Sequence, residues 1–302
     1  MKRILTMSLA LSVLVLPACK GGASADAVKL VPDEADFIMG ASPKAIAGSE
    51  LYKKFSPDFK ESSDYKEAVG MFEDCGLKPL EFDAVVAGGA SDGDFVVVIA
   101  GSGVGKHDAA TCVVKAMQKQ NGEDESAEVV TDDGKDVVKF EKGRAYLVND
   151  NLVAITSTAW ETKVGELIDG KGKSAADNSK KDLLAKVDHK KAMWFVANVP
   201  SDMASMAAMA GPEATEVKTV VGAMDLSKGI AFEVLAGFGD KDKAKAAADA
   251  VQAMFDGAKG MAPEDLKGMV DSVKIEASGS DVKFAVSASM ADLEAAKKAS
   301  GM

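Results

Sequence analysis

The sequence is poor in the residues that carry most enzymatic chemistry. Its 302 residues include only two histidines, His107 and His189, and three cysteines. Neither histidine belongs to an HExxH pattern or another paired-ligand spacing of a zinc site. No G-x-S-x-G turn is present to supply a serine nucleophile. We therefore predict a protein that is not an enzyme and that holds no cofactor.

Long apolar runs and an excess of positive charge are absent from most of the chain as well. Beyond residue 18, no stretch approaches the roughly 20 apolar residues of a membrane-spanning helix. The net charge is −11, and an acidic surface repels the phosphates of nucleic acids. We therefore predict a body without a membrane span of its own and without a nucleic-acid partner.

The first 19 residues carry a targeting pattern. Two basic residues precede an uncharged run over positions 4–16, which is typical of a secretory signal peptide. The run closes with the residues LPAC (Leu16–Cys19), which resemble the lipobox of bacterial lipoproteins, although Pro17 departs from the residue usual at that position. The resemblance implies that residues 1–18 are removed and that Cys19 becomes a diacylated N-terminus, through which the protein is held at a membrane.

The residue after the cysteine bears on location. In lipoproteins of this kind an Asp there favours retention in the inner membrane, whereas this chain has Lys20. The resemblance therefore implies an anchor in the outer membrane of a Gram-negative bacterium, with the body in the periplasm or at the cell surface. Residues 19–28 are mostly small or polar and are expected to form the lipidated Cys and a flexible tether.

An internal repeat organises the rest of the chain. Three blocks recur in the same order: Ala35–Pro43 and Ala192–Pro200, Phe95–Ala100 and Phe232–Gly237, Gly134–Phe140 and Gly279–Phe284. Each copy reads as β-α-β-β-α-β with extra strands, which is the ferredoxin-like order. We predict an α+β protein of two tandem ferredoxin-like repeats with antiparallel sheets, at residues 29–169 and 182–302, joined by a polar linker at residues 170–181.

Two cysteines remain in the mature chain, Cys75 and Cys112. They lie in a compartment that favours disulfides, and neither has a counterpart in the second copy. We expect them to form a disulfide; the alternative is a pair of free thiols in the core.

The stretch from Gly101 to His107 has the look of a phosphate-binding loop, since Gly105 and Lys106 stand where a Walker A motif places Gly-Lys. His107 replaces the hydroxyl residue that would hold magnesium, and the second copy carries Asp240 and Asp242 at the same turn. We therefore predict a turn of the fold and no nucleotide partner.

A run of methionines offers the strongest hint of a metal. Met203, Met206 and Met209 recur at every third residue, and thioethers are ligands for Cu(I). Steps of three spread side chains around a helix, so core packing is the competing interpretation.

The sequence thus favours a lipid-anchored envelope protein with a non-enzymatic binding or scaffolding role, whose envelope-protein partner or small ligand would bind between the repeats. Its body is similar in style to two-repeat lipoproteins of unknown function in Gram-negative bacteria. The alternatives are a periplasmic Cu(I)-binding protein and a hydrolase that uses paired carboxylates.

Overall fold

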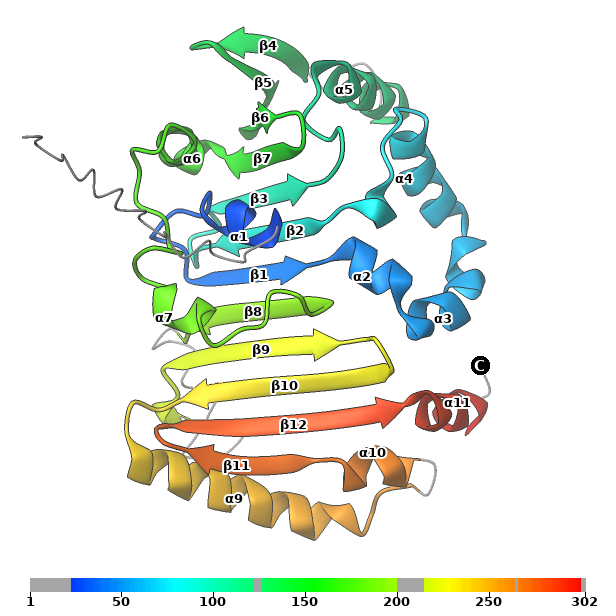
Figure 1. The fold of residues 1–302 in the computed structure, drawn as a ribbon, viewed down its shortest axis with the longest axis vertical. Helices are drawn as coiled ribbons and strands as arrows, with labels where there is room; N and C mark the ends of the chain where they lie inside the picture. The colour runs from blue at the N-terminus through cyan, green and yellow to red at the C-terminus, as the bar shows by residue number, and fades with distance from the viewer. Residues whose placement is uncertain (1–22, 122–126, 200–214, 264–265, 300–302) are drawn as a thin grey trace, which may run out of the picture.

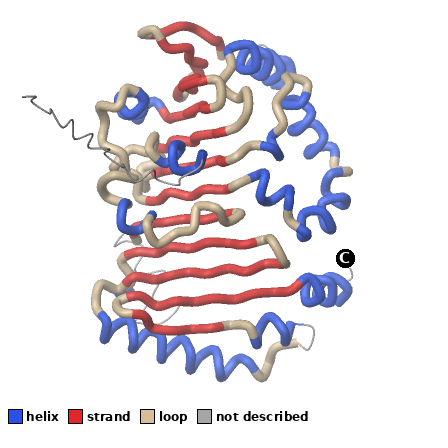
Figure 2. Tube along the Cα trace, in the orientation of Figure 1, coloured by secondary structure: helices blue, strands red, loops and turns tan. Residues whose placement is uncertain are grey.

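The computed structural model describes residues 23–121, 127–199, 215–263 and 266–299. Their strands form one antiparallel sheet of 12 strands, in the spatial order β11-β12-β10-β9-β8-β1-β2-β3-β7-β6-β5-β4 (Figure 1). Helices lie at the two ends of this sheet and also on its left and right sides in the view of Figure 2. The prediction of a mixed helix and strand protein with antiparallel pairing is therefore confirmed.

The strands are β1 (Phe37–Ala41), β2 (Ala84–Gly89), β3 (Phe95–Ala100), β4 (Glu128–Asp132), β5 (Lys135–Phe140), β6 (Gly143–Asn149), β7 (Leu152–Ser157), β8 (Met193–Asn198), β9 (Thr219–Asp225), β10 (Gly229–Gly237), β11 (Lys274–Ser278) and β12 (Asp281–Ser289). The α-helices are α1 (Ala23–Val28), α2 (Pro43–Gly48), α3 (Glu50–Lys60), α4 (Ser63–Glu73), α5 (His107–Asn121), α6 (Glu161–Ile168), α7 (Lys181–Leu184), α9 (Lys241–Lys259), α10 (Lys267–Asp271) and α11 (Met290–Ala299). Two short 3-10 helices are η1 (Pro79–Glu81) and η2 (Thr158–Trp160).

The two copies of the repeat meet at β1 and β8, which pair antiparallel in the middle of the sheet. Phe37 pairs with Ala197, and Gly40 pairs with Trp194. In the sequence match of the first repeated block, by contrast, Phe37 corresponds to Trp194 and Gly40 corresponds to Ala197. Because Phe37 lies on the same face as Met39, whereas Trp194 lies on the face of Ile38, the residues matched by the block lie on opposite faces of the sheet. We call β1 to β7 the first half of the sheet and β8 to β12 the second half.

The ferredoxin-like part of the prediction is not confirmed. In that fold the two strands joined by a helix are separated by another strand. Here β1 lies directly beside β2 although three helices connect them, and all strands belong to one sheet. The strands of the third repeated block, β5 and β12, do not occupy equivalent places in the sheet. β12 lies beside β10, whereas β5 is three places away from β3. The position equivalent to β12 in the first half belongs to β7.

Side chains alternate between two faces of the sheet, which we name by what covers them. The closed face carries Ile38, Val86, Val96 and Trp194, which pack in one core beneath α1 and its following turn, Trp160, α6 and α7. The open face carries the alternate residues. Its two ends are covered by α5 in the first half and by α9 in the second, and these helices lie at opposite ends of the sheet (Figure 1).

Two segments differ from their predicted character. Residues 23–28 of the expected tether form α1, with Ala27 fully buried and Val28 nearly so. Residues 170–181 of the expected linker are fixed to the start of the fold: the Ala175 N–H donates to the Val31 carbonyl at 2.9 Å, and the Lys180 side chain is 1% exposed. Both segments are rich in Ala, Ser and Gly, and such small residues pack closely against the sheet as readily as they form a linker.

Side chains cap the first turn of some helices and not of others. The Ser49 hydroxyl accepts the Tyr52 N–H at 3.0 Å at the start of α3. Ser289 and Asp292 form a capping box at the start of α11, with distances of 2.8 and 3.2 Å. Thr158 and Glu161 have the same spacing in the sequence but form no such box, because α6 begins only at Glu161, whose carboxylate binds Arg144 at 2.7 Å.

Candidate binding groove

An apolar groove of about 260 Å³ lies on the open face at the junction of the two halves. It crosses the central strands β2, β1, β8, β9 and β10, which supply the side chains around it: Val85, Met39, Met193, Phe195, Met224 and Phe232. Met193 is directly opposite Met224, and Met39 is directly opposite Phe195. Residues from both copies of the repeat therefore meet at one site.

The groove is lined almost wholly by carbon and sulfur, and large apolar side chains remain in contact with solvent there. Met39 is 47% exposed and Met193 is 45% exposed. Phe95, on the same face near the other end of the strands, is 43% exposed. A neighbouring set of exposed apolar side chains of this size is uncommon on a protein that has no partner.

The sequence shapes the groove through glycines in the central strands. Gly40 lies against the indole ring of Trp194 on the closed face, and a side chain at that position would collide with the ring. Gly222 lies in the same way against the ring of Phe195 on the open face. Because Phe195 lies over Gly222, the floor of the groove is an aromatic ring rather than backbone.

Several polar groups lie behind the groove, on the closed face of the same strands. At the end of β9, next to Met224, the Lys191 ammonium lies 2.6 Å from the Asp225 carboxylate. This ion pair, together with hydrogen bonds from Ser227, holds the pKa of Asp225 well below its usual range. His189 packs edge-on against Trp194 with ring centroids 4.6 Å apart, and burial lowers its pKa. The His189 side chain is half-buried.

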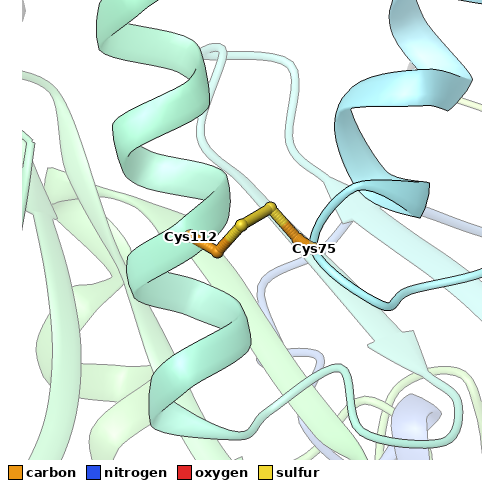
Figure 3. The surroundings of a disulfide bond; sticks show 2 residues. All are labelled: Cys75 and Cys112. Atoms are coloured by element: carbon orange, nitrogen blue, oxygen red, sulfur yellow. A yellow bond between two sulfur atoms is a disulfide. The ribbon is translucent and has the colours of Figure 1, made fainter.

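The predicted disulfide is present. Cys75, which follows α4, is bonded to Cys112 of α5 with a Cα–Cα distance of 5.5 Å (Figure 3). It fastens the two helices that border the open face of the first half, away from the groove.

The glycine-rich loop has its backbone donors engaged by the neighbouring hairpin. The Gly101 N–H donates to the Asn151 carbonyl at 3.0 Å, and the Gly105 N–H donates to the Asp150 carbonyl at 3.1 Å. The Gly103 N–H donates to the Asn151 side chain at 3.0 Å. These are the groups with which such a loop would bind phosphate, so the geometry agrees with a structural turn.

The remaining chemical candidates do not come together. His107 Nδ1 lies 3.1 Å from an Asp136 carboxylate oxygen at the surface, far along the chain from His189. Met203, Met206 and Met209 lie outside the described residues. Within the described ranges, no three His, Cys, Asp or Glu residues are grouped as a metal site, and no helix is long and apolar enough to span a bilayer.

The groove residues were missed by sequence reasoning, although a signal was present. The strands FIMGA and MWFVAN are apolar at almost every position, and such strands are usually covered on both faces. In the described structure only the closed face of β1 and β8 is covered. The pattern therefore indicated a second covering layer that the described part of the chain does not supply.

The architecture defines a class of mixed α/β proteins in which two related halves share one long antiparallel sheet. No protein-family model matches this chain, and no curated protein matches it. Among solved structures it is similar to TP0453. Crystal form III superposes with a TM-score of 0.53 at 8% identity over 90% of this chain and 97% of that chain. Crystal form I gives 0.50 at 11% identity over 92% and 98%. At such low identity the likeness shows a common fold and nothing further.

Proposed function

We propose that this chain is a non-enzymatic binding protein of the bacterial cell envelope, held at the outer membrane by a lipid on Cys19, and that its central groove binds apolar side chains of a partner protein. The observation that carries the proposal is the open face of β1 and β8. These strands are apolar on both faces, yet Met39 and Met193 remain almost half exposed.

The size and chemistry of the groove favour protein side chains over a whole small molecule. Pockets for small ligands usually enclose about 300–1,000 Å³ and place a few polar groups to orient the ligand. This groove measures about 260 Å³ and is lined by apolar side chains. Methionine side chains are flexible and polarisable, and they recur on surfaces that accept varied apolar partners.

The same chemistry speaks against the hydrolase alternative. Hydrolysis by paired carboxylates needs two acids that face each other across the substrate. Asp225 follows the groove residue Met224 in β9, so its side chain points to the opposite face of the sheet, where it is bound to Lys191. Among the residues that the structure describes, no acid lines the groove itself.

A first experiment uses the dye 8-anilinonaphthalene-1-sulfonate as a probe of the groove in the mature full-length chain. We expect Met39→Lys and Met193→Lys each to weaken dye binding about tenfold, a loss of about 1.4 kcal/mol. Matched controls are Met254→Lys and Met261→Lys, because these methionines are 63% and 80% exposed and lie outside the groove. Equal losses in all four variants would remove the groove as the site.

The anchor needs a separate measurement. The intact mass of protein extracted from membranes should correspond to cleavage before Cys19 plus the acyl chains. A soluble, unacylated product would refute the anchored part of the proposal and leave the dye experiment unaffected.

A further inference from the structure

The position of α1 restricts how a lipid-anchored form could sit on its membrane. Helix α1 contacts β2 and β3 on the closed face, where Ala27 and Val28 belong to the core. Val31, in the turn that follows, lies directly over Gly88 of β2 on that face. The chain therefore enters the fold from the closed side of the sheet, whereas the groove opens on the other side.

Only three residues separate Cys19 from the start of α1 at Ala23. A fully extended chain spans at most about 3.6 Å per residue, so the Cα atom of Cys19 lies within about 14 Å of that of Ala23. The tether predicted from the sequence spanned residues 19–28, and it is shortened to residues 19–22 because residues 23–28 pack into the fold.

This reach is too short to bring the open face to the same membrane. A packed helix has a diameter of about 10 Å, which places α1 roughly that far from the plane of the sheet. The side chains of the open face add several ångströms beyond the sheet. Cys19 would have to cover about 15 Å perpendicular to the sheet. It would also have to pass around the strand ends or a sheet edge, and each strand crossed on the way to an edge adds about 4.8 Å.

We infer that the short tether holds the closed face toward the membrane, so that the groove faces the aqueous compartment and takes the apolar side chains of a partner protein there, rather than acyl chains of the anchoring bilayer. This inference rests on the proposed anchor and groove. It implies that the partner reaches the open face from solution, on the side of the protein that points away from the membrane.

The experiment places a fluorescent nitrobenzoxadiazole label on either face of the acylated full-length chain. Met193→Cys reports on the groove, and Lys29→Cys reports on the closed side, where the Lys29 side chain is 58% exposed just after α1. Cys75 and Cys112 are bonded to each other, and Cys19 is blocked by acylation, so each variant has one reactive thiol.

Labelled protein is bound to vesicles of phosphatidylethanolamine and phosphatidylglycerol that contain a lipid with a nitroxide head group. We expect the nitroxide to quench the label at residue 29 at least about threefold more than the label at residue 193. Iodide in the water should quench the label at residue 193 as strongly as in the soluble Cys19→Ala form. Stronger nitroxide quenching at residue 193 than at residue 29 would overturn the orientation.

A longer tether provides a second test that does not depend on groove substitutions. Ten Gly and Ser residues inserted between Gly22 and Ala23 should remove most of the difference in nitroxide quenching between the two labels. If the difference is unchanged, the tether does not set the orientation and the inference fails. Dye binding to the groove is measured on unlabelled protein, so a failed orientation and a failed binding site give different results.

Discussion

The two halves of the sheet share a strand plan but differ in what covers the closed face. In the first half, Val96 of β3 is fully buried beneath the core that includes α1 and α6. In the second half the equivalent residue of β10 is Glu233, which is exposed and binds Lys283 at 2.8 Å. The closed face is therefore packed under helices at β3 of the first half, whereas at β10 of the second half it carries a side chain that faces water.

The open face shows the complementary difference. In α5 of the first half Val114 is 7% exposed, whereas its repeat equivalent Val251 in α9 is 39% exposed. The first half has the additional hairpin of β4 and β5 and the disulfide to α4, and both pack around α5. The described part of the second half has neither. The alanines of α9 that face the sheet are therefore buried, while Val251 remains partly exposed.

The largest expected effect exchanges the residues of the two closed faces. Val96→Glu would bury an unpaired carboxylate and is expected to lower the free energy of unfolding by about 3–5 kcal/mol. Glu233→Val removes only an exposed ion pair and should change it by less than about 1 kcal/mol. Urea unfolding of both variants measures the difference. Similar losses would mean that the two halves are covered alike.

Removal of the disulfide tests the staple of the first half. The bond closes a loop with a sequence separation of 37 residues, and the chain-entropy estimate for such a loop is about 4 kcal/mol. We expect the double variant Cys75→Ser, Cys112→Ser to lose about that much in guanidinium unfolding. As a control, dithiothreitol should lower the stability of the native chain to the same value and leave the variant unchanged.

The helix caps provide a smaller comparison. Ser289→Ala removes the hydroxyl that accepts the Asp292 N–H at the start of α11 and should cost about 1 kcal/mol. Thr158→Ala, at the matching place of the first half, should cost close to nothing, because α6 has no side-chain cap. Thermal unfolding of the two variants would contradict this difference if Thr158→Ala were the more harmful.

The smallest expected effect depends on pH. The pKa of Asp225 is lowered by the Lys191 ammonium and Ser227, so the folded state binds a proton less readily than the unfolded chain, whose Asp pKa is about 3.9. The stabilisation is present above about pH 4 and is lost as the pH falls further. Asp225→Asn should cost about 1 kcal/mol or less at pH 7, since both side chains are about one-third exposed. The cost should be clearly smaller at pH 2 than at pH 7, because the unfolded chain is then protonated at this position. Unfolding curves at the two pH values measure it; an equal cost at both would refute the ion pair as its source.

Several elements could be read directly from residue pattern. The mixed helix and strand class with antiparallel pairing followed from the order of apolar segments and turns along the chain. The disulfide followed from two cysteines present in one copy of a repeat only. The groove did not follow, because Met39, Met193 and Met224 are distant in sequence and come together only when β1 pairs with β8.

The sequence by itself determined the repeat, the antiparallel mixed class, the disulfide and a lipobox-like start, since each depends on residue type and spacing along the chain. Tertiary structure decided how the halves join, which face α1 covers, and on which face the groove opens. The physical reason is that strand pairing and burial depend on contacts between residues far apart in the chain, and small residues such as those at positions 23–28 are equally suited to a free tether and to a packed helix until their neighbours are in place.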